Sequence, residues 1–218
     1  MLGRYTPSPV APPPAMLTGV VRKTMTDRVQ LPRLTLAWIT PRQFAPGDAE
    51  LDVAAQVLAG GKNSRLHKRL VYDLQIAQDV SAVQDSAALA STFAIEVMVR
   101  PQPGTPASTL VERVQAIVDE ELDRLRGEPP TDREVQRARN QMEAAFYASL
   151  ERVGGFGGRA NRLNAYYVAT GNPDYAHEDL ARYRAITPRD VQAIVSRFLP
   201  RDRRVELVVE PAVQEQQQ

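Results

Sequence analysis

The sequence predicts an α+β fold of two layers, in which helices cover one face of a mostly antiparallel sheet. Three observations predict it. Segments that alternate apolar and polar residues, the period of a half-buried strand, lie near both ends of the chain. Segments with the 3.6-residue period of amphipathic helices fill most of residues 106–198. The predicted strands lack regular crossover helices, which indicates antiparallel pairing, and the helices are numerous enough to form a layer on one face.

Composition excludes several classes of function. The 27 Lys+Arg residues against 26 Asp+Glu leave a net charge of +1, so no field of one sign steers the 218-residue chain onto nucleic acid or an anionic membrane. The chain has no cysteine, which excludes disulfides, thiolate zinc sites and cysteine nucleophiles. No apolar run approaches the roughly 18 residues of a membrane span. We expect a soluble protein with no nucleic-acid partner and no membrane span.

The two ends of the chain differ in composition from the middle. Proline is dense in residues 1–16, which favours extended backbone and predicts a linker or a disordered lead-in. Residues 17–211 show no internal boundary and are predicted to form a single α+β domain, followed by a disordered tail over 212–218. The proline-rich segment follows Met1 almost at once and no targeting segment precedes it, so we expect the chain to be part of a longer protein.

The first elements are two strands and a helix. Residues 17–25 and 34–40 are rich in Val, Thr, Leu and Ile with partial alternation, which predicts two strands joined by a turn. A helix begins near Asp48 and carries apolar residues on one face. Gly60 and Gly61 are predicted to end it, because glycine adopts the left-handed conformation of a helix end easily.

A second helix and two strands follow. Ser64 is predicted to cap this helix, on which Leu66 and Leu70 share a face one turn apart. A strand begins at Val80, and residues 93–99 alternate strictly between apolar and other side chains. These two segments predict a sheet with one buried face.

The remaining elements are mostly helical. A continuous apolar stripe predicts a long amphipathic helix over 106–126, and Thr131 and Glu134 form a capping box that begins the next helix. Further helices are predicted over 159–170, over 174–184 and from Thr187 to about 199, and a last strand over 204–210.

Four glycines interrupt the helical region, at Gly154, Gly155, Gly157 and Gly158. Glycine in a helix costs about 1 kcal/mol relative to alanine, so the cluster indicates a bend, a close packing or a hinge. A phosphate-binding loop would lie between a strand and a helix. Because this cluster lies between two helical segments, that interpretation is disfavoured.

No catalytic or metal-binding motif is present. His67 and His177 do not form H-E-x-x-H or H-x-x-E-H, in which two imidazoles one helical turn apart bind zinc. The acidic residues in 119–121 and in 177–179 are predicted to be solvent-exposed charges, since neighbours in sequence diverge around a helix. No serine has a G-x-S-x-G elbow, so nothing supports a catalytic serine.

A resemblance to a known family rests on residues 60–82, GGKNSRLHKRLVYDLQIAQDVSA. They resemble the segment G-G-x-x-S-R-L, a helix and A-x-x-V-S-A of the pitrilysin/insulinase zinc metallopeptidases, the inverzincins with a processing-peptidase-like fold. The resemblance extends to the proline-rich lead-in, RVQLPRLTLAWITP, ARNQMEAAFYASLE and ITPRDVQAIVSRFLP. It implies an antiparallel sheet covered by helices, in a domain that occurs two or four times per particle, with two lobes that close around a peptide.

The resemblance also implies where the chemistry lies. In the family, the zinc-binding H-x-x-E-H belongs to the first domain of a catalytic lobe, and this chain looks like the second, non-zinc domain. The opposite lobe often supplies an arginine and a tyrosine seven residues apart, and the matching positions here are Val71 and Gln78. Arg65 and Tyr72 have that spacing in the wrong register. We therefore expect an inactive chain with no catalytic residue and no metal, and zinc in a partner domain.

The sequence leaves three hypotheses about the function open. The first is a non-catalytic domain of a zinc peptidase that forms chamber wall and lobe contacts, with a zinc-containing N-terminal domain of the same protein, a second lobe or subunit and a peptide substrate as partners. The second is a structural, inactive family member that acts as an assembly subunit. The third is an unrelated α+β ligand-binding domain. The resemblance suggests the bacterial periplasm, and possible substrate contacts are Gly60, Gly61, Ser64, Arg65 and Gln78.

Overall fold

A computed structural model of the chain describes residues 17–155 and 157–212. The predicted linker, 1–16, and residues 213–218 of the predicted tail lie outside the described residues. Ala212 is described, and its amide donates a hydrogen bond of 2.8 Å to the Asp27 carbonyl. This residue therefore continues the pairing of the last strand.

The sheet has five strands in the order β1-β5-β2-β4-β3. Three of its pairs are antiparallel, and only β1 and β5 are parallel, so the predicted, mostly antiparallel sheet is confirmed. The first two strands follow each other in sequence, but the last strand lies between them. The strands are β1 Val21–Asp27, β2 Arg33–Thr40, β3 Ala77–Asp85, β4 Ser91–Val99 and β5 Val205–Pro211.

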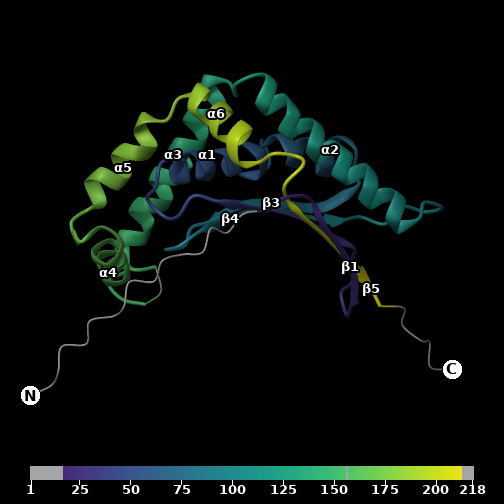
Figure 1. Cartoon of the computed structure of the whole chain (residues 1–218), viewed down its shortest axis with the longest axis horizontal. Coiled ribbons are helices and arrows are strands. Elements are labelled where there is room, and N and C mark those ends of the chain that lie inside the picture. Colours follow the sequence, from purple (N-terminus) through teal and green to yellow (C-terminus); the bar gives the residue numbers. More distant parts are fainter. Residues whose placement is uncertain (1–16, 156, 213–218) are drawn as a thin grey trace, which may run out of the picture.

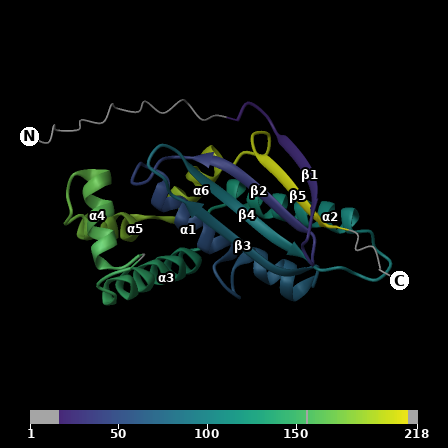
Figure 2. The same cartoon turned by 90° about the horizontal axis from the view of Figure 1, so that it is seen from below.

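The helices form a layer on one side of this sheet, as the two-layer prediction requires (Figure 1). Seen from below, the strands lie in front of the helices, and no helix in the described part of the chain crosses the near face of the sheet (Figure 2). The helices are α1 Asp48–Ala59, η1 His67–Asp73, α2 Ala107–Gly127, α3 Asp132–Glu151, α4 Arg159–Thr170, α5 Ala176–Ala185 and α6 Pro188–Phe198.

The core lies between the sheet and the helices. Along β2, Leu34, Leu36 and Trp38 are buried, while the alternate side chains are partly exposed on the open face. β4 alternates in the same way. Most residues of α1 are buried in the same core. The Trp38 indole N–H donates to the Pro200 carbonyl at 2.8 Å, which satisfies its one polar atom in the core.

The helix after Gly61 differs from the prediction. Gly61 has the expected left-handed conformation, with φ at 88°, and Leu66 and Leu70 are fully buried. Ser64, however, does not cap the helix, because its hydroxyl donates to the Gly61 carbonyl at 2.6 Å. The helix that follows is a π-helix, a form that sequence periodicity does not reveal.

The prediction of exposed acidic residues in 119–121 is wrong for two of the three. Asp119 and Glu121 are almost fully buried, and only Glu120 is exposed. Asp119 pairs with the buried Arg204, the residue before β5, and Glu121 pairs with Arg69 of η1 at 2.9 Å. These arginines come from elements far along the chain, so the helical pattern of α2 alone could not show that its polar positions face charged partners.

The same prediction is wrong for one residue in 177–179. His177 and Glu178 are exposed, but Asp179 is buried and accepts hydrogen bonds from Tyr166 and Arg182. Burial of a carboxylate requires such partners. Asp179 belongs to a polar cluster that joins α5 to the rest of the helical layer.

Candidate functional site

The segment that carried the resemblance lies at the β3 edge of the sheet. Gly61 and Gln78 are exposed, Gly60 is partly exposed, and Ser64 is fully buried. Gln78 lies at a register shift of β3 between Ala77 and Asp79. Of the five possible substrate contacts, Gly61 and Gln78 are therefore the two that are exposed.

Arg65 is held by an ion pair within the chain. Its guanidinium forms two hydrogen bonds with Glu134 at the start of α3, Nε to Oε1 at 2.7 Å and Nη2 to Oε2 at 3.0 Å. Burial acts to raise the pKa of Glu134, but the bonds from Arg65 and Thr131 outweigh it and lower this pKa to about 2. Arg65 thus fastens the segment to α3.

The two positions that match the family's arginine and tyrosine carry no charge here. Val71 packs against the core, and Gln78 faces solvent. In residues 17–155 and 157–212, no group of three or more His, Cys, Asp or Glu side chains could hold a metal ion. The described residues thus offer neither a metal centre nor the substrate-gripping pair.

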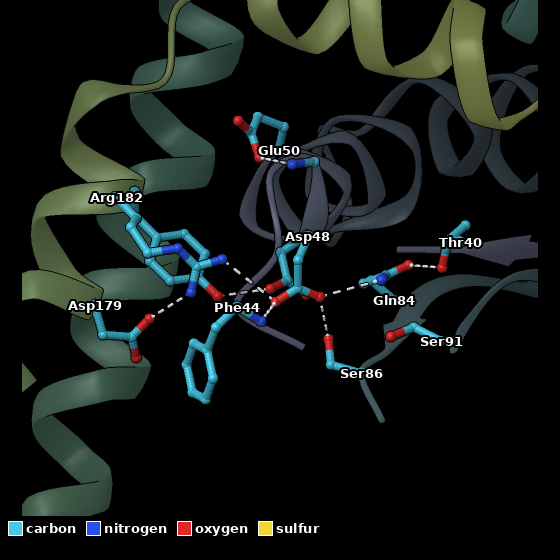
Figure 3. Close-up of polar contacts among 12 residues, drawn as sticks. Thr40, Phe44, Asp48, Glu50, Gln84, Ser86, Ser91, Asp179 and Arg182 are labelled. Carbon is cyan, nitrogen blue, oxygen red and sulfur yellow. Dashed lines mark hydrogen bonds and ion pairs between the residues drawn. The ribbon is translucent and has the colours of Figure 1, made fainter. Parts of the chain in front are cut away.

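A polar cluster that the sequence did not reveal lies at the beginning of α1 (Figure 3). Asp48 is 3% exposed, and its carboxylate accepts hydrogen bonds from the Phe44 amide at 2.8 Å, the Ser86 hydroxyl at 2.6 Å and the Gln84 amide at 3.2 Å. Gln84 in turn accepts from the Thr40 hydroxyl at 3.0 Å. The position of a carboxylate in the first turn of a helix is favoured by the helix dipole.

Arg182 of α5 completes this cluster. Its guanidinium lies 3.3 Å from Asp48 Oδ2 and 3.1 Å from Asp179 Oδ1, so it bridges two buried carboxylates (Figure 3). The guanidinium also lies 5.2 Å from the centre of the Phe44 ring. The Tyr166 hydroxyl donates to Asp179 Oδ2 at 2.7 Å. These contacts fasten α4 and α5 to α1.

Asp52, one turn after Asp48, has a shifted pKa. Burial is the main cause that raises this pKa, from 3.8 to about 7, and the nearby Asp48 and Asp179 raise it further. A hydrogen bond of 2.6 Å from the Tyr183 hydroxyl and the charge of Arg182 act in the opposite direction. Burial likewise raises the pKa of Tyr183 above its usual value.

The cluster borders a cavity of about 270 Å³ between α1, α4 and α5. Apart from tyrosine, Ser86 is the one described residue with a hydroxyl group among the side chains that line the cavity, and this hydroxyl donates to Asp48. No histidine is among the described lining residues to activate it. The carboxylates are engaged by arginine, tyrosine and amide donors. This arrangement stabilises the helical layer.

The glycine cluster lies beside this cavity. Gly155 and Gly157 have φ values of 81° and 75°, which only glycine adopts easily, and Gly157 lines the cavity. A Cβ on Gly158 would lie 2.5 Å from the Gly154 carbonyl oxygen, so the backbone passes close to itself there. The hinge stays a prediction.

The family model described as the peptidase M16 inactive domain matches residues 3–142. The chain belongs to the peptidase M16 family. The resemblance found in residues 60–82 is thereby confirmed, and the M16 domain in question is the one described as inactive.

Relatives and solved structures agree with this assignment. An uncharacterized zinc protease of Streptomyces coelicolor is 28% identical over 180 residues, which are 83% of this chain and 36% of that protein. A protease from Helicobacter pylori has a TM-score of 0.78 at 18% identity, over 96% of this M16 chain and 48% of that chain. The M16 inactive domain from Pseudomonas fluorescens has a TM-score of 0.70 at 17% identity, over 89% and 44%. The chain thus spans about a third of its curated relative and about half of these structures.

Proposed function

We propose that this M16 chain is a non-catalytic domain of a zinc-dependent peptidase, and that it forms part of the wall of the chamber in which a peptide is cleaved. The zinc is held by another domain. The observation that carries the proposal is the one-sided sheet, which leaves a face of five strands uncovered by the described helices. The family match and the zinc-protease relative support it.

The open face is chemically mixed. Strand registers place Lys23, Leu207, Thr35, Glu96 and Ser81 in one row across all five strands. Apolar, hydroxyl and charged side chains therefore alternate along the row. Such a surface can contact the main chain and varied side chains of a peptide without selecting one sequence.

The β3 edge borders this face and supplies the proposed substrate contacts. Among the proposed contacts, Gly61 and Gln78 are exposed and Gly60 is partly exposed. Ser64 and Arg65 hold it in place through their bonds to the Gly61 carbonyl and to Glu134. We assign these two residues to support of the segment.

The proposed partners are a zinc-containing domain, a second lobe and the peptide, with residues 17–211 acting as one unit. Support comes from the length of the relatives, which extend well beyond the part that this chain matches. A periplasmic protease from Escherichia coli shares the fold, with a TM-score of 0.63 at 12% identity, and we propose the periplasm on that ground. No helix within the described ranges is long and apolar enough to cross a membrane.

Site-specific photo-crosslinking tests the chamber wall. A photo-reactive amino acid replaces Thr35 on the open face in the assembled peptidase, and the matched control carries it at Gln136, an exposed position of α3. We expect a bound substrate peptide to crosslink from position 35 and not from position 136. Equal yields, or crosslinking from position 136 alone, would refute the wall. A stable complex that neither cleaves nor crosslinks peptide would favour the alternative, a structural assembly subunit.

A further inference from the structure

The strand β1 forms one outer edge of the sheet, beside β5 (Figure 2). All seven of its residues are exposed, including Val21 at 51% and Met25 at 41%. A strand that pairs on one side and is exposed on both faces buries little in the described part of the chain. Its free edge is a template for another strand.

The backbone groups that point to this free edge can be identified. The Val21 amide donates to the Arg204 carbonyl at 2.9 Å, and the Asp27 carbonyl accepts from Ala212, so these residues direct their backbone groups toward β5. Backbone groups alternate in direction along a strand. The N–H and C=O groups of Arg22, Thr24 and Thr26 therefore point away from the sheet.

The opposite edge is less suited to strand addition. β3 carries a register shift between Ala77 and Asp79, and η1 packs against it. Irregular strands of this kind protect an edge from pairing. β1 keeps one continuous register with β5 over all seven residues.

A cleft of about 380 Å³ lies on the helix side of β1. Arg22 and Thr24 of β1 line it on one side, and Glu112 and Gln115 of α2 line it on the other. α2 therefore does not close over β1. The cleft leaves room for side chains of an added strand on the helix side of the sheet.

Charge selects the kind of strand. Arg22, Lys23 and Arg28 lie on or just after β1 with one acidic residue, Asp27. Arg22 bonds to Glu206 at 2.8 Å but its side chain stays 71% exposed, and Lys23 and Arg28 form no ion pair with any residue of the described ranges. A second copy of β1 would bring like charges together, which disfavours a symmetric dimer at this edge. An added strand with acidic side chains beside Lys23 on the open face complements it.

We propose that β1 is an assembly edge, at which an extended acidic segment of the companion domain adds a sixth strand to the sheet. The inference rests on the proposed function, because it takes the companion domain from there. The segment would bond to the backbone of Arg22, Thr24 and Thr26, place acidic side chains near Lys23 and Arg28, and lie beside Val21 and Met25 on the open face.

Amide hydrogen exchange tests the pairing. The 218-residue chain is compared alone and in complex with its companion domain, and the amides of Arg22, Thr24 and Thr26 are expected to exchange at least about tenfold more slowly in the complex. Unchanged exchange at these three amides in a complex that forms would overturn the proposal.

Variants and a peptide probe test the chemistry. The probe is a synthetic nine-residue peptide of alternating glutamate and valine at up to about 1 mM, a range that detects weak association. Thr24→Pro removes one outward N–H and leaves the β5 ladder intact, so binding should weaken about tenfold, while Thr24→Val should bind as the unaltered chain does. A lysine-valine peptide should bind more weakly, and Lys23→Glu should narrow that difference.

Equal binding to Thr24→Pro and Thr24→Val, or protection at β3 in place of β1, would overturn the strand addition. The melting temperature of each variant shows whether that variant is folded. The test requires neither zinc nor peptide cleavage, so its failure leaves the proposed function standing. Failure of the cleavage and crosslinking tests would in turn leave the strand addition measurable.

Discussion

Removal of the Asp48 carboxylate should destabilise the domain more than removal of an exposed carboxylate does. Asp48→Ala would leave the Phe44 amide, the Ser86 hydroxyl and the Gln84 amide without their acceptor. It would also remove one of the two carboxylates that the Arg182 guanidinium bridges. Each hydrogen bond to a charged group contributes about 1.5–3 kcal/mol, but the adjoining cavity admits water to some of the donors. A broken buried ion pair costs about 3–5 kcal/mol, and we expect a loss of that size.

The free energy of unfolding, measured by urea denaturation at pH 7, checks this value. Asp48→Asn keeps the shape and an acceptor for the Phe44 amide, so it should lose about 1–3 kcal/mol. The matched control is Asp123→Asn, an acidic residue of α2 with a side chain 52% exposed, which should change stability by less than about 1 kcal/mol.

A double-mutant cycle with Arg182→Met separates the ion pair from the other bonds. Coupling of at least about 1 kcal/mol between positions 48 and 182 is expected, because the two side chains are in direct contact. A fall in the free energy of unfolding for Asp48→Ala no larger than that for Asp123→Asn would refute the role of this cluster in fastening α5 to α1.

Three further predictions concern pH dependence and backbone conformation. The pKa of Asp52 is about 7 in the folded chain and 3.8 without the folded surroundings. The stabilising contribution of Asp52 is therefore present below pH 4 and is lost as the pH rises through about 7. Asp52→Asn should therefore flatten the fall in unfolding free energy between pH 4 and pH 8, and an unchanged slope would contradict this. The pKa of Glu134 is lowered to about 2, so its contribution is present above pH 4.5 and lost as the pH falls through about 2. Arg65→Met should lower stability at pH 7 by about 1–2 kcal/mol and reduce the acid dependence, and equal acid midpoints would count against the pair. Gly158→Ala should destabilise by more than about 1 kcal/mol because its Cβ would meet backbone oxygen, whereas Gly154→Ala has open space, and equal melting temperatures would disprove the close approach.

Periodicity and capping signals predicted much of the fold. The alternation of residues 93–99 matches β4, the apolar stripe of 106–126 matches α2, and the capping box of Thr131 and Glu134 is present with reciprocal bonds. These features depend on neighbours within a few residues. Local sequence therefore contains the information that determines them.

Contacts between distant residues were not predictable in this way. Asp48 and Arg182 are 134 residues apart, and Asp119 and Arg204 are 85 apart. The one local signal at Asp48 was a carboxylate in the first turn of a helix, which helix capping explains without any distant partner. The insertion of β5 between β1 and β2 depends on the packing of the whole chain for the same reason.

Zinc content and peptide hydrolysis of the purified 218-residue chain distinguish a non-catalytic domain from a complete peptidase. We expect no stoichiometric zinc and no cleavage by the chain alone, and cleavage once the zinc-containing domain is added. One bound zinc ion per chain together with hydrolysis by the isolated chain would contradict this expectation.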